Sequence, residues 1–450
     1  MKDFTLAEIA KACNGEYVGD ESLKNTKITS VERDSRQVKN GSLFLAIKGE
    51  RVDGHDFIEK CFAQGAVCAL CEKTPENATK PCIVVPSTLD AVKKIGRAYR
   101  EKFDIPVIGI SGSVGKTSTK EMLYAVLSQK FKTHKTQGNL NNELGVPLTL
   151  LSMPEDTEAA VIEMGISDFG EMTRLSEMVQ PTICVLTIIG ECHLENLGNR
   201  GGVLKAKTEM FKNARENADF ILNGDDDKLS TVKTVNGKKP VFFGLDAKND
   251  FYAKNIKNSG DGKVLATLCF DNNNIDVEIP AIGTYMVTNA LAAAAAGKLL
   301  GLTDEEIANG VASYKTVGSR ANVINTGKIK IIDDCYNANP TSVRASLDTL
   351  SNLDGRKVAI LGDMKELGSE ELKLHFDTGV YAKSKGIGTV ITVGELAKEL
   401  AKGADGKAFD TIEDAKTEIL KTIKSGDVVL VKASHSMQFE NIVEFLKQNF

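Results

Sequence analysis

Residues 106–117 have the sequence PVIGISGSVGKT, in which an apolar strand runs into a glycine turn, and helical sequence continues to Lys130. In such a turn the backbone N–H groups converge on phosphate oxygens, the lysine places its charge at the β- and γ-phosphates, and the next hydroxyl can bind magnesium. A glycine usually stands where this chain has Ile110, and the shortened form is commoner outside the ordinary kinases and GTPases. The residues predicted to bind the nucleotide are Gly112, Ser113, Val114, Gly115, Lys116, Thr117 and Ser118.

Two further apolar strands are expected after this unit, at residues 159–163 and 182–187, and helical sequence separates them. Strands that alternate with helices form parallel sheets that are covered on both faces. The middle of the chain is therefore predicted to be a doubly wound, mainly parallel α/β sheet.

The chain of 450 residues is too long for one hydrophobic core. Short strands, helices and turn residues indicate a small mixed α/β domain over residues 1–102. We expect a central ATP-binding domain over 103–315 and a second, Rossmann-like α/β domain over 316–450, with a linker at 316–319. The predicted fold class is therefore α/β with three domains.

Residues 231–279 are rich in Asn, Asp and Gly and suggest an antiparallel excursion from the central sheet. An alanine-rich helix is expected next, from Asn289 to Leu300, and its small side chains favour close packing. In the last domain, apolar runs followed by amphipathic helical sequence predict four strands, at 329–332, 357–361, 390–393 and 428–431.

The composition excludes several classes of function. A charged fraction of 26%, an apolar fraction of 42% and a net charge of -5 give no sign of a nucleic-acid partner or of membrane insertion. Residues 1–10 contain Asp3 and Glu8 in place of a basic segment followed by an apolar run, so no signal peptide is expected.

The nine cysteines are scattered, and several lie in apolar runs, which fits a reducing cytoplasm. Cys68 and Cys71 have the spacing of half a zinc site, but no second such pair follows. The surrounding apolar residues favour a buried strand at this position.

Two side chains that follow central strands are candidate metal ligands. Glu163 ends one apolar strand and would lie at the carboxyl edge of the sheet, where ligands of open α/β folds bind and where a carboxylate suits Mg²⁺. His193 follows another strand in polar sequence. Both could instead be ordinary solvated residues, and the residues alone leave this open.

Lys205 and Lys207 lie in helical sequence and could belong to a solvated face. A lysine could act beside magnesium only if its charge were altered, because an ammonium group repels the metal.

Amide side chains gather in residues 136–147 and again in residues 333–340. Amides bind polar uncharged groups such as sugars and peptides, but turns also collect asparagine. No Ser/His/Asp order and no twin pair of metal ligands suggests a hydrolase or a zinc enzyme.

Taken together, these stretches resemble the Mur ligases of peptidoglycan synthesis over nearly the whole chain. The segments that carry the resemblance are 34–36, 41–46, 53–57, 112–117, 138–142, 193–196, 333–340 and 362–368. The resemblance implies a domain for the UDP end of the substrate, a central ATPase domain and a C-terminal domain that closes over the site. It also implies the reaction: ATP phosphorylates the terminal carboxylate of a UDP-N-acetylmuramoyl-tripeptide, and the amine of D-alanyl-D-alanine displaces phosphate to form an amide.

The resemblance also assigns roles to particular residues. Lys116 and His193 would act in catalysis together with Lys207, which aligns with the lysine that family members carbamylate, although Lys205 is close enough to leave that alignment open. Two Mg²⁺ ions are implied, and their ligands would be Thr117, Glu163, His193 and the modified Lys207. Asn289 would bind the adenine base, Arg320 the phosphates and Asp334 the ribose. The implied substrate-binding residues are Ser35, Arg36, Asp53, Gly54, His55, Asn139, Asn141, Asn142, Asn337 and Asn339. We expect a monomer.

Two departures from the family pattern stand out. Tyr285 and Met286 replace a usual His-Asn pair, which bears on the adenine contacts. Ala433-Ser434-His435 replaces a usual Gly-Ser-Arg, which bears on the dipeptide or C-terminal contacts. The folylpolyglutamate synthetase branch shares the ATPase logic, but residues 1–102 argue against it. A nucleotide switch that hydrolyses ATP only to change shape is the alternative from another class.

Overall fold

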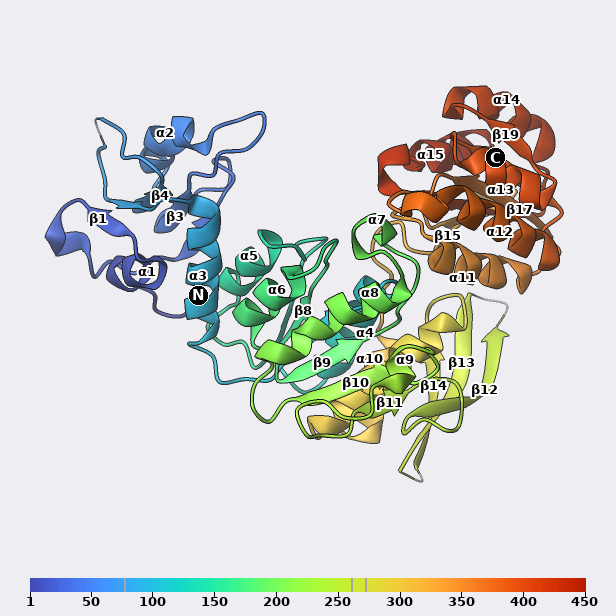
Figure 1. Ribbon diagram of the computed structural model, residues 1–450, viewed down its shortest axis with the longest axis horizontal. Helices are drawn as coiled ribbons and strands as arrows, with labels where there is room; N and C mark the ends of the chain where they lie inside the picture. The colour runs from blue at the N-terminus through green and yellow to red at the C-terminus, as the bar shows by residue number, and fades with distance from the viewer. Residues whose placement is uncertain (77, 260–261, 272) are drawn as a thin grey trace.

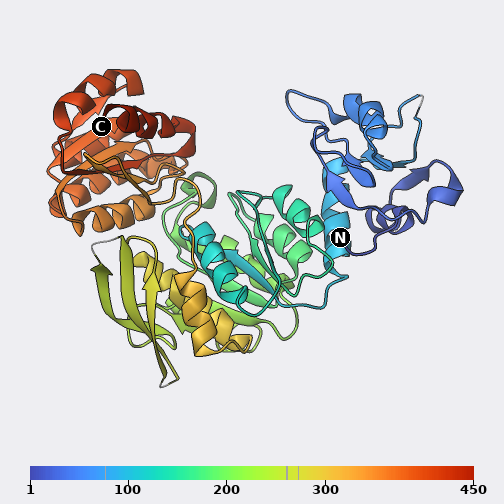
Figure 2. The same cartoon turned by 180° about the vertical axis from the view of Figure 1, so that it is seen from behind.

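The computed structural model describes residues 1–76, 78–259, 262–271 and 273–450 and arranges them as three α/β domains (Figure 1). The N-terminal and C-terminal domains lie at opposite ends of an elongated molecule, and the central domain lies between them, as the reverse view also shows (Figure 2). The predicted α/β class is confirmed. The domain boundaries at residues 102 and 315 stay predictions.

The N-terminal domain is built on a five-stranded sheet of order β1-β5-β4-β3-β2, in which β1 alone runs antiparallel to its neighbour. Its strands are β1 (Glu16–Val18), β2 (Ser30–Glu32), β3 (Ser42–Leu45), β4 (Cys68–Cys71) and β5 (Cys82–Val84). Its helices are α1 (Leu6–Cys13), η2 (Gly54–Phe57), α2 (Ile58–Ala63) and α3 (Thr88–Arg100). Because Cys68 and Cys71 are the two ends of the buried strand β4, the strand interpretation of this segment is confirmed.

The central domain holds a six-stranded, wholly parallel sheet of order β11-β10-β9-β6-β8-β7. Its strands are β6 (Val107–Ser111), β7 (Thr133–Lys135), β8 (Ala159–Glu163), β9 (Ile183–Leu186), β10 (Asp219–Asn223) and β11 (Val241–Phe243). The chain runs from β6 to one edge of the sheet and later crosses to β9 on the other side of β6. The loops after β6 and β9 therefore lie at the topological switch point, where open α/β sheets bind ligands.

Helices cover both faces of this sheet. They are α4 (Lys116–Leu127), α5 (Gly145–Leu151), α6 (Glu171–Val179), α7 (Leu194–Leu197), α8 (Arg200–Thr208), α9 (Tyr285–Leu299) and α10 (Asp304–Ala312). Helix α9 begins one turn earlier than predicted, and its run Ala292–Ala296 is completely buried in the core it shares with α4 and β6. Small side chains thus give close packing, as expected.

The predicted antiparallel excursion is confirmed in its described part. Strands β12 (Tyr252–Ser259), β13 (Lys263–Phe270) and β14 (Asn273–Ile279) form a separate antiparallel sheet. Residues 260, 261 and 272, which the prediction also covered, lie outside the described part of the chain.

The C-terminal domain has a six-stranded sheet of order β15-β16-β20-β17-β18-β19. Its strands are β15 (Asn322–Asn325), β16 (Lys330–Asp333), β17 (Arg356–Gly362), β18 (Thr389–Val393), β19 (Lys407–Phe409) and β20 (Asp427–Lys432). Its helices are α11 (Pro340–Ser351), η5 (Gly368–Glu370), α12 (Glu371–Ser384), α13 (Ala397–Ala404), α14 (Ile412–Thr422) and α15 (Glu440–Asn449). All four predicted strands are present, and β15 is an antiparallel edge strand that the prediction missed. In the part of the chain that the structure covers, no helix has the length and apolar character to cross a bilayer.

Candidate active site

The phosphate loop joins β6 to α4 in a conformation that only its glycines adopt easily. Gly112 has φ +152° and Gly115, the residue before α4, has φ +84°. A Cβ on Gly112 would lie 1.9 Å from Thr187 Oγ1, so the loop after β9 leaves no room for a side chain there. The loop therefore presents its backbone N–H groups at the N-terminus of α4, where the helix dipole favours an anion.

Hydrogen bonds fasten this loop to the segment after β9. Ser113 N donates to Ile188 O at 2.8 Å, and Gly190 N donates to Ser113 Oγ at 2.9 Å. Thr187 Oγ1 donates to Val114 O at 2.6 Å. The two loops at the switch point are thus held as one rigid unit, a pre-organisation that phosphate binding requires.

The Lys116 side chain contacts the backbone of the phosphate loop. Its Nζ donates to Gly112 O at 2.7 Å. Removal from water lowers the pKa of Lys116, while the carboxylate of Glu163 opposes that shift and Arg320 adds to it. Arg320 of the C-terminal domain is therefore close enough to act on the same charge as Lys116.

Glu163 ends β8 and lies beside the phosphate loop, as predicted. Thr117 Oγ1 donates to its Oε2 at 2.9 Å, and Asn141 Nδ2 donates to its Oε1 at 2.8 Å. The hydroxyl and the carboxylate are hard oxygen ligands of the kind that Mg²⁺ prefers, and they already touch. The chemistry of these donors fits one magnesium ion.

A buried cation lies behind this pair. Lys120 Nζ lies 3.8 Å from Glu163 Oε2 and donates to Thr136 O at 2.8 Å, and Thr136 Oγ1 accepts from Glu163 N at 2.9 Å. The carboxylate is thus oriented from two sides. Sequence reasoning missed Lys120, whose only signal was a lysine four residues after Lys116 on the buried face of α4.

The structure separates the two candidate lysines of α8. Lys205 is exposed, whereas only 1% of Lys207 is exposed. Burial lowers the pKa of Lys207 to about 8, with Cys192 opposing the shift and Lys116 adding to it. Lys207 therefore lies near the phosphate loop with an amine that loses its proton easily.

His193 precedes α7 in a left-handed conformation, with φ +51°. Its Nδ1 lies 2.5 Å from Oε2 of Glu366 in the C-terminal domain, and this proximity lowers the pKa of the Glu366 carboxyl. Across the described residues, no group of three or more His, Cys, Asp or Glu side chains is assembled as a metal site. A second magnesium ion fits this donor set only if Lys207 becomes an anion.

The predicted nucleotide residues come from two domains. Thr119 Oγ1 donates to Asn289 Oδ1 at 2.9 Å, which places Asn289 between α4 and α9 beside Gly115. The Arg320 guanidinium stacks 3.8 Å from the Tyr336 ring centroid. Lys432 Nζ donates to Asp334 Oδ2 at 2.7 Å and fixes its position. Burial raises the pKa of Tyr285, and the charge of Asp334 raises it further.

The asparagines of residues 333–340 differ in their surroundings. Asn337 is exposed, and the backbone carbonyl of Asn337 accepts from Lys432 Nζ at 2.9 Å. Asn339 caps α11, because its Oδ1 accepts from Ser342 N at 2.8 Å. Asn337 Oδ1 accepts from Ala338 N at 2.9 Å, so a backbone N–H group holds the side-chain oxygen of each asparagine, and Asn337 is the more exposed of the two.

The other amide-rich loop shows the same division. Asn142 Oδ1 accepts from Gly145 N at 2.8 Å at the start of α5, and Asn139 is exposed. Of these three asparagines, Asn141 is the one that contacts Glu163, through its Nδ2.

The remaining predicted substrate residues belong to the N-terminal domain, which lies at one end of the molecule (Figure 1). Arg36 forms a bidentate pair with Asp34 that lowers the pKa of that carboxyl to about 2, and Ser35 lies between them in the sequence. His55 bridges Asp53, whose Oδ1 lies 2.6 Å from Nδ1, and the backbone N of Glu72, which donates to Nε2 at 2.9 Å. A Cβ on the intervening Gly54 would lie 2.7 Å from the backbone of Ile47.

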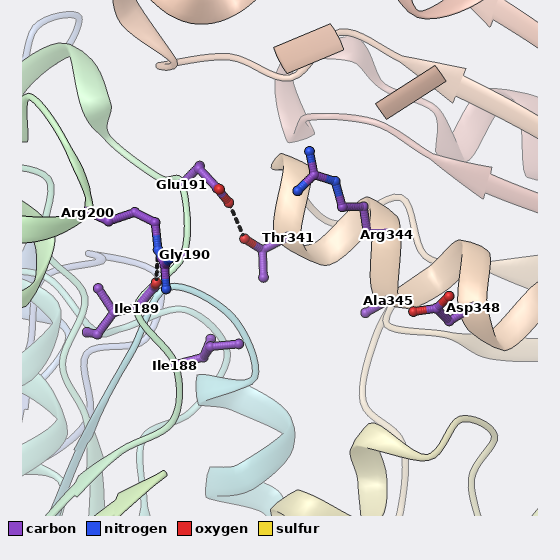
Figure 3. Close-up of a pocket in the computed structure, with 9 residues that line it drawn as sticks. All are labelled: Ile188, Ile189, Gly190, Glu191, Arg200, Thr341, Arg344, Ala345 and Asp348. Atoms are coloured by element: carbon purple, nitrogen blue, oxygen red, sulfur yellow. Dashed lines mark hydrogen bonds between the residues drawn. The ribbon is translucent and has the colours of Figure 1, made fainter. Parts of the chain in front are cut away.

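A pocket of about 290 Å³ lies between the central and C-terminal domains (Figure 3). Thr341 Oγ1 of α11 donates to Glu191 Oε2 at 2.6 Å across it, and Arg200 Nε donates to Ile189 O at 2.7 Å. The Arg344 Nε is buried without a hydrogen-bond partner among the residues that the structure covers. Sequence reasoning missed these residues, and Thr341 and Glu191 are 150 positions apart in the chain.

Comparison with known proteins gives three family matches along the chain. The "Mur ligase family, catalytic domain" model matches residues 27–104, the "Mur ligase middle domain" residues 110–297 and the "Mur ligase, glutamate ligase domain" residues 319–435. The UDP-N-acetylmuramoyl-tripeptide--D-alanyl-D-alanine ligase of Bacillus subtilis is 36% identical, and the match covers 98% of each chain.

Solved structures give the same picture. A crystal structure of MurF from Acinetobacter baumannii is 32% identical, with a TM-score of 0.92, over 100% of this chain and 99% of that one. MurF ligase from Thermotoga maritima in complex with ADP is 30% identical, with a TM-score of 0.84, over 93% of this chain and 97% of that one.

Proposed function

The chain belongs to the Mur ligase family, and we propose that it is an ATP-dependent ligase that joins D-alanyl-D-alanine to a UDP-N-acetylmuramoyl-tripeptide in peptidoglycan precursor synthesis. The observation that carries this proposal is the contact of Thr117 and Glu163 beside the phosphate loop, at the switch point of the central sheet. The full-length similarity to tripeptide ligases supplies the substrate class.

The reaction follows from the chemistry of a carboxylate, which is a poor electrophile. An oxygen of the terminal carboxylate attacks the γ-phosphorus of ATP, and ADP leaves. The amine of D-alanyl-D-alanine then attacks the carbonyl carbon of the acyl phosphate, and phosphate leaves with that oxygen as the amide forms. Lys116 neutralises charge on the transferring phosphoryl group, and alignment supplies most of the remaining acceleration.

Magnesium belongs to this proposal. Thr117 and Glu163 would hold one ion, and His193 and a carbamylated Lys207 would hold a second. These ions would neutralise phosphate charge when bound. Carbamylation joins a neutral lysine amine to CO₂ and releases a proton, so an anion replaces the cation. The burial of Lys207, which lowers its pKa to about 8, favours that residue over the exposed Lys205.

The nucleotide would be bound from two sides, by residues 112–118 and Asn289 of the central domain and by Arg320 and Asp334 of the C-terminal domain. Domain closure would then complete the site and exclude water. Asn337 is a candidate for the incoming dipeptide. Asn339, whose Oδ1 caps α11, is the second candidate.

The N-terminal domain, residues 1–102 on the proposed boundaries, would bind the UDP end of the substrate. Ser35, Arg36 and the segment 53–55 are the candidates, with Asn139, Asn141 and Asn142 nearer the peptide. We also propose that the protein works in the cytoplasm as a monomer. Its nine free, buried cysteines are consistent with a reducing compartment.

The test measures phosphate release from ATP with UDP-N-acetylmuramoyl-tripeptide, with and without D-alanyl-D-alanine. Sustained release is expected only when both are present, with one new amide per phosphate. Release that is indifferent to both substrates would indicate a nucleotide switch instead. Turnover with folate and glutamate would favour the folylpolyglutamate branch.

A further inference from the structure

The loop of residues 362–368, between β17 and η5, carries part of the family resemblance but has no assigned role. Its Glu366 has φ +65°, a left-handed conformation that is uncommon for a residue with a side chain. Strained residues of this kind persist where the surrounding structure holds them, and they cluster at functional sites. The conformation of Glu366 therefore calls for a function.

Three hydrogen bonds from separate elements hold this loop in place. Asp363 Oδ1 accepts from Ala397 N at 2.8 Å, and Met364 N donates to His375 Nε2 at 2.9 Å. Lys365 N donates to Ser434 Oγ at 3.0 Å. The loop is thus a rigid platform of the C-terminal domain, and it projects the Glu366 side chain outward.

The Glu366 carboxylate meets His193 of the central domain. Its Oε2 lies 2.5 Å from Nδ1 of that ring. Nδ1 is buried and has no well-aligned hydrogen bond to any group in the described ranges, so the nearby carboxylate is the group that can satisfy it.

The segment that carries His193 contacts the C-terminal domain on both sides of this pair. Thr341 Oγ1 donates to Glu191 Oε2 at 2.6 Å (Figure 3), and a Cβ on Gly368 would lie 3.2 Å from Glu195 Cα. The placement of the His193 ring therefore depends on the placement of the C-terminal domain.

We propose that Glu366 is a positioning residue that orients His193 across the domain interface. By accepting the proton of Nδ1, the carboxylate leaves the lone pair on Nε2 free to bind a metal ion. Histidines that bind metals usually donate their other ring N–H to a carboxylate or carbonyl, which fixes the tautomer. This inference rests on the proposed role of His193 as a magnesium ligand, and it links that role to the position of the C-terminal domain.

The first test reads the tautomer directly. The metal-free, full-length protein is labelled with ¹⁵N at its five histidines, and the His193 signals are assigned by their loss in His193→Gln. We expect a proton on Nδ1 in the unmodified protein and on Nε2, or on both nitrogens in exchange, in Glu366→Ala. A ring that keeps its proton on Nδ1 in Glu366→Ala would overturn the proposal.

The second test measures Mn²⁺ binding to the ADP complex by the electron spin resonance of the free ion. The ion of interest is the one lost in His193→Gln. Its affinity should fall about 10- to 100-fold in Glu366→Ala, the usual loss when such a partner is removed. A smaller loss of affinity is expected in Glu366→Gln, because the amide oxygen remains as a neutral hydrogen-bond acceptor. If Glu366→Ala does not fold, Glu366→Gln alone provides the test. Unchanged affinity in both variants would overturn the proposal.

Glu370→Gln is the matched control, because Glu370 is an exposed carboxylate on η5 that pairs with Lys373 at 3.9 Å. It should leave both readouts unchanged. The outcome is separable from that of the proposed ligase reaction, because the tautomer is read without substrates. Loss of ligase activity with a normal tautomer would count against the proposed function and not against the orientation of His193.

Discussion

Lys207 shows how burial can prepare a side chain for chemistry that its ordinary form opposes. The sequence places two lysines two positions apart, and both could carry a carbamate. The α8 helix turns Lys207 inward and leaves Lys205 in water, and burial lowers the pKa of Lys207 to about 8. A protonated amine cannot react with CO₂, so the desolvated lysine is the better acceptor.

Replacement of Lys207 by alanine should therefore lower kcat by at least about 100-fold, the scale seen when one charge-stabilising group is lost. Short-chain carboxylates such as acetate should restore part of the activity by filling the space of the carbamate. Lys205→Ala is the matched control, and its activity should stay within about twofold of the parent enzyme. Full activity in Lys207→Ala, or loss of activity in Lys205→Ala, would show that the carbamate lies on Lys205 or that the enzyme does not use one.

The lowered pKa of Lys207 also predicts a pH dependence. Below a pKa of about 8 the neutral fraction of this amine rises about tenfold per pH unit, and above it the fraction levels off. In enzyme depleted of CO₂ and then given a fixed dissolved CO₂ concentration, recovery of activity should follow that curve. Continued tenfold increases up to pH 10 would show that the acceptor has an ordinary lysine pKa.

The residues of the site were predictable from the sequence where a motif identifies them, but the groups that each of them contacts were not. Lys116, Thr117 and Glu163 lie together because a phosphate loop and a strand end both belong to the same sheet edge. Asn339 is predicted to meet the dipeptide, and its Oδ1 also caps a helix, so the dipeptide contact stays a prediction. Asparagine suits both tasks, and no local pattern separates them.

At the scale of elements, the loops after β6 and β9 depend on each other. Gly112 can approach Thr187 only because it lacks a side chain. Gly112→Ala should abolish ADP binding that calorimetry can measure, because the added Cβ would push the phosphate loop away from the loop after β9.

The control for this change is Gly237→Ala. Gly237 also has a positive φ, +80°, but a Cβ there would meet nothing within 4 Å in the described part of the chain. Its free energy of unfolding, measured by thermal unfolding, should fall by only roughly 1–2 kcal/mol, because alanine is strained in the left-handed conformation. Its ADP binding should be normal. Normal ADP binding by Gly112→Ala would show that the loop tolerates displacement.

Strands with long apolar runs were predicted well, and short or edge strands were not. The predicted range 159–163 matches β8, because a strand buried on both faces is a continuous apolar run. The edge strand β15 (Asn322–Asn325) is mostly exposed and has only two apolar residues between two asparagines, so its sequence resembles a loop. Its antiparallel pairing with β16 depends on a neighbour that the local sequence does not reveal.

For the whole molecule, the arrangement of domains decides whether the proposed site is complete. Arg320 and Asp334 belong to the C-terminal domain, and the phosphate loop belongs to the central one. An ATP analogue with both substrates should therefore reduce the radius of gyration measured by small-angle X-ray scattering. Lys116→Ala, which weakens nucleotide binding, should show little compaction, and an unchanged radius for the parent enzyme would exclude closure.

Contacts between domains were the least predictable part of the structure. Glu366 and His193 are 173 positions apart (366 minus 193), and each lies in a segment that looks like a loop when read alone. The sequence resemblance pointed to both segments without pairing them. Only the placement of the domains brings the carboxylate to the ring.

The central claim is that ATP activates the tripeptide carboxylate as an acyl phosphate, and ¹⁸O transfer tests it most directly. UDP-N-acetylmuramoyl-tripeptide is labelled with ¹⁸O at both oxygens of its terminal carboxylate and turned over with ATP and D-alanyl-D-alanine. Mass spectrometry should find one ¹⁸O in each released phosphate and one in the new amide. Phosphate without label, formed at the same rate as the amide, would contradict the account.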